Sequence, residues 1–248
     1  MEYKPGKPDF RHIDLFARNV TTVMGKMRKE AERIYTDDEI VVKDKYMYLM
    51  GNIPIMLVAH VDTKYPPSTD IQHDKSKNVL WSNNHLGADD RAGVAAIREI
   101  IRECTKDYKP SVALLDEEEK GCIGAKEFAS DFKNKVITVE NINAVIELDR
   151  RGANDAAFYD CDNKEFTEYI KSLGFNAVKG SCSDIKHICP AIHVAGVNLP
   201  IGFENEHEPN ERLFLDQWQK TLDIVKSVVK NPPERLYAYV KKSSNSLP

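Results

Sequence analysis

The sequence predicts an α/β fold: a three-layer α/β/α sandwich, in a single domain, with a mixed, mainly parallel central sheet. Short apolar runs rich in branched side chains, typical of strands buried on both faces of a parallel sheet, alternate with segments of helical periodicity. The 248 residues, of which 42% are hydrophobic, can also bury one large core. We expect the domain to span 1–240 and the polar tail 241–248 to be disordered.

The elements are expected in a regular order along the chain. Apolar residues spaced three or four apart from Phe16 to Ile34 predict a long amphipathic first helix, and the alternating stretch 39–51 is typical of a β-hairpin. After the hairpin, buried strands alternate with helices. The predicted strands span 53–60, 111–116, 143–149 and 191–203, and the predicted helices span 94–104, 123–132, 164–173 and 215–229. The Asn-Pro-Pro at 231–233 ends the last helix, because proline lacks the backbone donor.

Charge and composition argue against several classes of function. The net charge is −4 and the basic residues are scattered, so no basic patch for a nucleic acid is expected. No apolar run reaches the roughly 20 residues that cross a bilayer, and the opening segment lacks the apolar stretch of a secretory signal. The five cysteines are odd in number and never spaced Cys-x-x-Cys, which favours reduced thiols and a cytoplasmic protein. We expect neither a nucleic acid nor a membrane as partner, and the oligomeric state stays open.

Chemically active side chains follow three of the predicted strands where each strand ends. His60 and Asp62 follow the first strand, residues 117–119 (Glu-Glu-Glu) follow the second, and Asp149 closes the third. In open α/β sheets, sites form outside the carboxyl ends of the strands, so we expect these groups at one edge. A mixed set of imidazoles and carboxylates suits zinc or a similar divalent ion.

The stretch LGADDRAGV, residues 86–94, places two aspartates side by side before an alanine-rich run. Asp89 and Asp90 could form a solvated helix start, since aspartate suits an N-cap and a first turn. The alternative is a bridging carboxylate between two cations about 3.5–4 Å apart, which must be screened from each other. In that arrangement Asp89 bridges the ions and Asp90 holds the turn that aims it. Asp62 would fix the tautomer of His60.

Five short motifs occur in order between His60 and Glu211: AHVDT, GADDRAG, EEKGCIGA, ELD and EHEPNE. In these motifs the chain resembles the co-catalytic (di-zinc) exopeptidase family, which includes bacterial leucyl aminopeptidase, peptidase T and glutamate carboxypeptidase. Each motif is weak alone, but five in order are a strong signal. The resemblance implies a catalytic domain with two zinc ions per chain, or other divalent ions in their place.

The resemblance assigns roles motif by motif. The implied metal ligands are His60, Asp89 as the bridge, Glu119, Asp149 and His207. Glu118, the first residue of Glu-Glu-x-Gly, is the implied general base, and Asp62 is the implied acid that orients His60. A zinc-bound hydroxide would attack the scissile carbonyl while Glu118 takes the proton. A shift of one residue would make Glu117 the base instead, because Gly121 alone sets the register.

The substrate side of the site is less defined by the sequence. Ser183 and Asp184 resemble a substrate loop of the family, although the pair also suits a helix N-cap. Arg150 could meet a substrate carboxylate beside the fourth ligand, with a surface arginine as the ordinary alternative. His187 is expected in a loop that could line the site, and His193 in an apolar strand is expected in the core.

The implied function is a metal-dependent exopeptidase, in first place an aminopeptidase, acting on peptides. Only 58 positions separate Asp149 from His207 and 27 separate Asp62 from Asp89, so the domains that some branches insert there do not fit. Three alternatives stay open. They are an amidohydrolase that deacylates N-acyl amino acids at the same site, a pseudoenzyme that binds metal or peptide, and a plain α/β binding domain with acidic strand ends.

Overall fold

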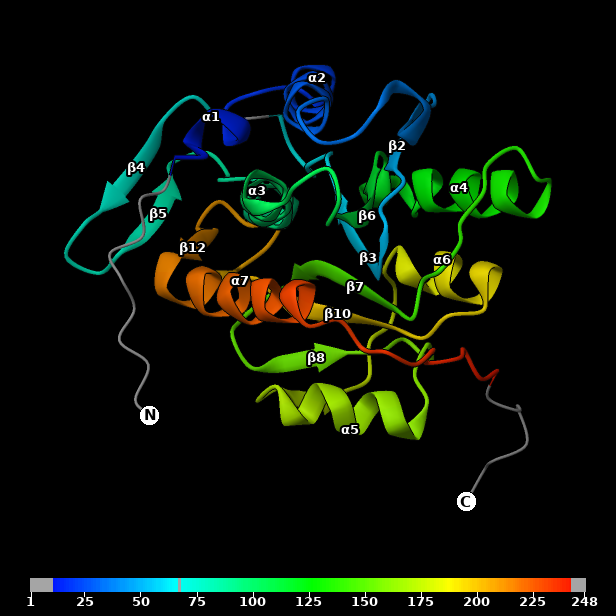
Figure 1. Cartoon of the computed structure of the whole chain (residues 1–248). Helices are drawn as coiled ribbons and strands as arrows, with labels where there is room; N and C mark the ends of the chain where they lie inside the picture. Colours follow the sequence, from blue (N-terminus) through cyan, green and yellow to red (C-terminus); the bar gives the residue numbers. More distant parts are fainter. Residues whose placement is uncertain (1–10, 67, 242–248) are drawn as a thin grey trace.

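The computed structural model of the chain describes residues 11–66 and 68–241, so most of the predicted tail, 242–248, lies outside the described residues. Helices cover both faces of a central sheet, and a smaller sheet lies beside it (Figure 1). The helices are α1 (Ile13–Phe16), α2 (Val20–Ala31), α3 (Ala88–Glu103), α4 (Ile123–Lys133), α5 (Lys164–Ser172), α6 (Ile185–Ile192) and α7 (Leu215–Lys230), with short 3-10 helices η1 (Asp37–Glu39) and η2 (Glu118–Lys120). Within the described ranges, no helix combines the length and the apolar composition needed to cross a bilayer.

The central sheet has eight strands with parallel strands at its centre. In spatial order they are β1 (Ile40–Val42), β2 (Tyr46–Leu49), β6 (Pro110–Leu115), β3 (Ile53–His60), β7 (Ala144–Arg150), β10 (Gly196–Pro200), β8 (Asp155–Ala157) and β9 (Asn176–Val178). The neighbours β6, β3, β7 and β10 are parallel, and β1 and β2 form the predicted antiparallel hairpin. The predicted α/β sandwich with a mixed, mainly parallel sheet is confirmed.

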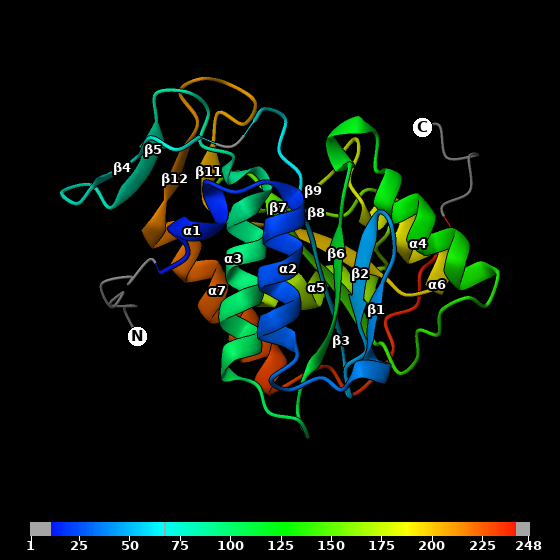
Figure 2. The same ribbon diagram turned by 90° about the horizontal axis from the view of Figure 1, so that it is seen from above.

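The central strands are buried on both faces because their side chains alternate between two cores. In β3, Ile55 and Leu57 join the core on one face, while Met56 and Val58 join the core on the other. The first core packs against α2, α3 and α7, and the second packs against α4 and α6 (Figure 2). A strand that is buried on both faces therefore appears in the sequence as one apolar run, which is the pattern from which these strands were predicted.

The predicted first helix is wrong as one continuous element. The chain forms α1 and α2 instead, and Asn19 is the N-cap of α2, where its side chain accepts a hydrogen bond from the backbone N–H of Thr22 at 2.9 Å. Asparagine offers its own side chain to free backbone donors, so it begins a new helix here. Periodicity does not reveal the break, because Phe16 and Val23 still face the same core.

The predicted strand 191–203 is shorter than expected. Helix α6 extends to Ile192, and β10 begins only at Gly196. Between them His193 is exposed and adopts a left-handed conformation with φ of 60°, so the expectation of a core histidine in a strand is wrong. An apolar run does not distinguish the end of a buried helix from the start of a buried strand.

A second sheet was not predicted from the sequence. Its antiparallel strands are, in spatial order, β11 (Phe203–Glu204), β12 (Arg212–Phe214), β5 (Val79–Ser82) and β4 (Ile71–Asp74). Strands this short give no sustained alternation of apolar and polar residues. Leu80 and Leu213 nevertheless join the same core as β3, so the two sheets share one hydrophobic core.

Three neighbouring parallel strands end at one edge of the central sheet. His60 of β3 pairs with Leu115 of β6, and Val58 of β3 pairs with Glu147 of β7. Two residues further in the same direction, Asp149 is level with His60. The predicted acidic and imidazole groups therefore arrive at a common edge.

Candidate metal centre

Asp89 lies at the start of α3 between two groups of predicted ligands. Its Oδ1 is 3.0 Å from Nε2 of His60, and its Oδ2 is 3.1 Å from Nε2 of His207. Asp149 completes the first group, with Oδ1 3.3 Å from the same His60 nitrogen. Glu119 completes the second group, with Oε1 2.7 Å from His207 Nε2. The structure thus brings the five residues together, with one oxygen of Asp89 in each half.

The ligands of the first half lie on strands or at a helix start, and those of the second half lie mainly on loops. His60 ends β3 and Asp149 lies near the end of β7, so the first half is set by neighbouring strands. Glu119 lies in η2, and His207 lies in the loop between β11 and β12 with φ of 65°. The second half therefore depends on loops that other side chains must hold in place.

Glu211 holds the turn that carries Asp89. Its Oε2 accepts a hydrogen bond from the backbone N–H of Gly87 at 2.6 Å, and its Oε1 accepts one from the backbone N–H of Asp89 at 3.0 Å. Gly87 has φ of 71°, a left-handed conformation that glycine adopts without a steric penalty. Burial raises the pKa of Glu211 to about 7. From the sequence, Glu211 was expected to support the His207 loop; its contact with the Asp89 turn was not predicted.

Asp90 is fully buried and supports the site from behind. Its Oδ2 accepts a hydrogen bond from the backbone N–H of His60 at 3.2 Å, and its Oδ1 accepts one from that of Gly93 at 2.9 Å. A side chain at Gly93 would lie 2.1 Å from the carbonyl oxygen of Leu148, so only glycine lets α3 approach β7 this closely. Asp90 also lies within ligand distance of the His60 half, but backbone donors already occupy its two oxygens. This placement supports the predicted role of holding the turn.

The centre carries more negative charge than its imidazoles balance. Burial disfavours the charged form of His60, but the carboxylates of Asp149, Asp62 and Asp89 outweigh burial and raise its pKa well above the usual range. Burial and the nearby Asp89 also raise the pKa values of Asp149 and Glu119. A bound divalent cation relieves repulsion of this kind.

The donor set and its spacing fit zinc. In a tetrahedral site with bonds of about 2.0–2.1 Å, two nitrogen or oxygen ligands lie about 3.3 Å apart. The four contacts around Asp89 range from 2.7 to 3.3 Å. Each half offers one imidazole, one carboxylate of its own and one oxygen of Asp89. Three protein ligands leave a fourth position open, as in catalytic zinc sites.

Asp62 connects the two halves. Its Oδ1 is 3.2 Å from Nδ1 of His60, the contact predicted to orient that ring. The same carboxylate also accepts hydrogen bonds from the backbone N–H groups of Glu118 and Glu119, at 3.1 and 3.2 Å. One side chain therefore orients a ligand of the first half and fixes the loop that carries a ligand of the second.

We expect Asp62→Ala to weaken zinc binding or turnover about 10–100-fold without unfolding the chain, the usual range for residues that orient a metal ligand. Because Asp62 holds both His60 and the Glu119 loop, both halves should be affected. Zinc titration by calorimetry, activity and circular dichroism on the same samples measure this. Asp74→Ala on the second sheet is the matched control, and unchanged zinc affinity and turnover in Asp62→Ala would contradict the assignment.

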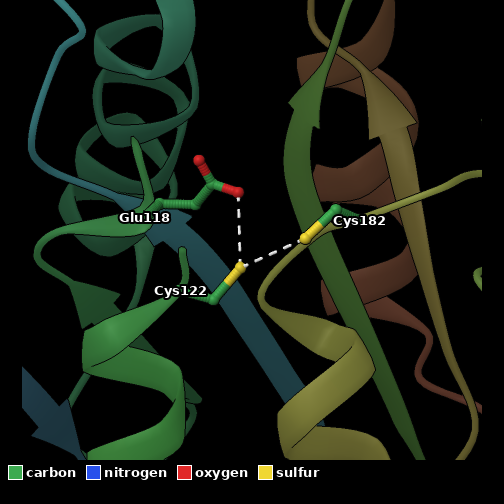
Figure 3. A group of neighbouring side chains, drawn as sticks. All are labelled: Glu118, Cys122 and Cys182. Atoms are coloured by element: carbon green, nitrogen blue, oxygen red, sulfur yellow. Dashed lines mark hydrogen bonds between the residues drawn. The ribbon is translucent and has the colours of Figure 1, made fainter. Parts of the chain in front are cut away.

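Glu118 lies beside Glu119 in η2, and its side chain turns toward two cysteines (Figure 3). Its Oε1 is 3.5 Å from Sγ of Cys122. Among residues 11–66 and 68–241, no lysine or arginine forms an ion pair with Glu118. The general-base role of Glu118 remains a prediction.

Glu117 has different surroundings. Its Oε1 is 2.9 Å from Nζ of Lys120 and 3.4 Å from Nζ of Lys45, and these contacts lower its pKa. A carboxylate paired with two lysines is a weaker base. The geometry therefore favours the register in which Glu118, rather than Glu117, is the base.

The predicted substrate-side residues lie around the centre. Ser183 is buried with its hydroxyl donating to Glu147, and Asp184 is fully buried, which raises its pKa to about 8. Arg150 is half-buried at the end of β7. His187 lies within α6, so its expected place in a loop is wrong. The substrate-binding roles of Ser183, Asp184 and Arg150 remain predictions.

Asn198 is a supporting residue that the sequence analysis missed. Its Oδ1 accepts a hydrogen bond from the backbone N–H of Asp149 at 2.9 Å, and its Nδ2 lies 3.2 Å from the carbonyl oxygen of Asp149 and 3.3 Å from Oγ of Ser183. Glu147 is likewise fully buried inside an apolar strand. The available signal was a polar residue within a buried run, since such a residue needs a partner.

A cavity of about 470 Å³ opens beside the second half of the centre. Its lining includes Asp62, Glu119, Lys64, Tyr65 and Arg91. Nζ of Lys64 is 3.7 Å from Oε2 of Glu119. The cavity borders Glu119 at the metal-binding edge and has the volume of a small-molecule site.

Sequence and structure comparisons agree with this geometry. The sequence model of peptidase family M28 matches residues 45–187, more than half of the chain. No curated protein has a matching sequence. The matched segment contains Asp62, Asp89, Glu118, Glu119 and Asp149.

Several solved structures share the fold at low sequence identity. The aminopeptidase PepT from Bacillus cereus is 15% identical with a TM-score of 0.62, covering 89% of this chain and 96% of that chain. A tripeptidase from Staphylococcus aureus is 14% identical with a TM-score of 0.64, covering 90% and 97%. A TET aminopeptidase from a marine sediment archaeon, Thaumarchaeota archaeon, is 14% identical with a TM-score of 0.67, covering 90% and 98%.

Proposed function

This chain belongs to peptidase family M28, and from that premise we propose that it is a metal-dependent aminopeptidase that holds two zinc ions at the Asp89 centre. The observation that carries the proposal is that the two oxygens of Asp89 face different His–carboxylate pairs, those of His60 and His207. The solved structures described as aminopeptidases and a tripeptidase support the choice of a short peptide with a free amino terminus as substrate.

The residues of the chain have distinct parts in the proposed reaction. When bound, the two ions would activate water and polarise the scissile carbonyl. Glu118 takes a proton as the bond is attacked and delivers it to the leaving amine, a contribution of about 10²–10⁴-fold. Asp62 keeps Glu118 and Glu119 in place through their backbone N–H groups. The cavity lined by Lys64 and Tyr65 receives the substrate chain.

Metal analysis and a substrate panel test the proposal together. We expect about two zinc ions per chain at saturation, and hydrolysis of aminoacyl and short peptide substrates that acetylation of the amino terminus prevents. A preference for N-acyl amino acids would identify an amidohydrolase instead. Two bound ions with no hydrolysis would identify a pseudoenzyme, and no bound metal at micromolar free zinc would reject the metal centre itself.

We propose the cytoplasm as the location of the enzyme. All five cysteines are free thiols, although Cys122 and Cys182 lie close together, and free thiols fit a reducing compartment. The proposed partner is the peptide substrate.

A further inference from the structure

A second group of metal-binding side chains lies next to the Asp89 centre. Glu118 and Cys122 come from the segment between β6 and α4, and Cys182 comes from the loop before α6 (Figure 3). Helices α4 and α6 pack against each other, which brings the two segments together. One carboxylate oxygen and the two sulfur atoms lie within 4.8 Å of one another.

Two of the three distances between these atoms match the edges of one zinc tetrahedron. With a Zn–S bond of about 2.3 Å and a Zn–O bond of about 2.0 Å, tetrahedral geometry places two sulfurs about 3.8 Å apart and a sulfur and an oxygen about 3.5 Å apart. The observed distances are 3.7 Å between Sγ of Cys122 and Sγ of Cys182, and 3.5 Å between Sγ of Cys122 and Oε1 of Glu118. A disulfide would instead need the sulfurs about 2.05 Å apart.

Asp184 gives an independent indication of a ligand at this place. It is fully buried, and no hydrogen bond of normal geometry reaches either of its carboxylate oxygens. The Cys122 thiol is its neighbour, close enough to interact with it. A buried carboxylate without a donor is costly unless a cation or a proton compensates it. The two sulfurs and the carboxylate oxygen of Glu118 are a donor set for a thiophilic cation.

We propose that Glu118, Cys122 and Cys182 form a third metal site, which takes a thiophilic divalent ion such as zinc or cadmium. Cys182 is exposed, so the ion can enter from solvent. As the two metal–sulfur bonds form, each thiol releases its proton to water. The site is distinct from the two halves around Asp89, because it shares no ligand with them.

Occupation of the third site has a consequence for catalysis. A cation bound to Glu118 lowers the basicity of its carboxylate and holds the carboxylate at the cysteines, so the third ion inhibits the enzyme. Excess zinc would then limit turnover while the two ions at Asp89 remain bound. This consequence rests on the proposed function of Glu118, whereas binding of the third ion does not.

Cadmium titration of the full-length protein already loaded with zinc tests the site. We expect one further equivalent to bind with a thiolate-to-cadmium absorption band and to protect two thiols from a thiol reagent. Cys122→Ser and Cys182→Ser should each weaken this binding at least about 10–100-fold, while their two zinc ions remain. Cys104→Ser is the matched control, because Cys104 lies at the end of α3, outside the group, and it should behave as the unchanged protein.

The outcomes separate the metal site from its effect. Absence of the absorption band, or the same band in both serine variants, would overturn the site, as would a disulfide between Cys122 and Cys182 in protein purified under reducing conditions. Peptidase activity, taken for each variant relative to its own value without cadmium, should fall in the unchanged protein and persist in Cys182→Ser. Binding of the third ion with full activity would leave the site standing and contradict the general-base role of Glu118.

Discussion

Glu118→Gln is expected to fold, hold both metal ions and lose about 10²–10⁴-fold in turnover. Glutamine keeps the shape and the hydrogen-bonding capacity of the side chain but cannot accept a proton. The backbone N–H of residue 118 still donates to Asp62, so the loop keeps its position. The substrate KM should change little, because the lost interaction belongs to the transition state.

Glu119→Gln should fail in a different way. Its carboxylate contacts His207 and belongs to the second half of the centre, so the change removes a charged metal ligand. We expect the ion of that half to be lost first, with activity partly recovered by excess zinc. Metal content and activity must be measured on the same purified samples to separate the two neighbours.

Two further variants on the same loop serve as controls. Lys120→Ala removes an exposed ion pair with Glu117 and should do little, because solvent screens such pairs. Glu117→Gln should also retain most activity, because Glu117 is held by lysines. If Glu117→Gln were the metal-loaded, inactive protein, the register of the motif would be off by one residue. If all three glutamine variants stayed active, the peptidase mechanism would fail with them.

The parallel centre of the fold could be predicted because its strands have no polar face. In the predicted strands 53–60 and 143–149, successive side chains enter two different cores, so both runs are mainly apolar. This apolar composition is visible in the sequence alone. The second sheet left no comparable signal, since strands of two to four residues are set by tertiary pairing. The break at Asn19 was also missed, although asparagine is a frequent N-cap.

The candidate ligands could be predicted from their positions, but their supports could not. His60, Asp149 and the aspartate pair follow strand ends or a glycine turn, where chemistry is expected. The contacts of Asn198 with Asp149 and of Glu211 with the Asp89 turn join segments 49 and 122 residues apart. Contacts over such separations arise from folding and leave no local pattern in the sequence.

Asp89→Ala is expected to release both metal ions together, whereas the loss of any other ligand releases one. Its two oxygens serve the two halves separately, with Oδ1 beside His60 and Oδ2 beside His207. When the Asp89 carboxylate is absent, no anion lies between the two cations about 3.5–4 Å apart, and the cations repel each other. Metal content should fall from about two ions per chain toward zero, and turnover should fall further than in Glu118→Gln.

The stability of Asp89→Ala separates this effect from simple unfolding. Removal of Asp89 relieves its repulsion of Asp149 and Glu119, but it also removes the contacts with His207 and His60 that lower the pKa of Asp89. The backbone N–H of residue 89 still donates to Glu211, which keeps the turn. We therefore expect the metal-free variant to fold, with a Tm somewhat below that of the unchanged metal-free protein. Zinc at 1,000 times its Kd raises the free energy of unfolding by about 4.1 kcal/mol, and Asp89→Ala should lack this gain. Asp38→Asn, at an exposed position, is the control and should keep it. A variant that still gained stability from zinc and held two ions would show that Asp89 does not bridge them.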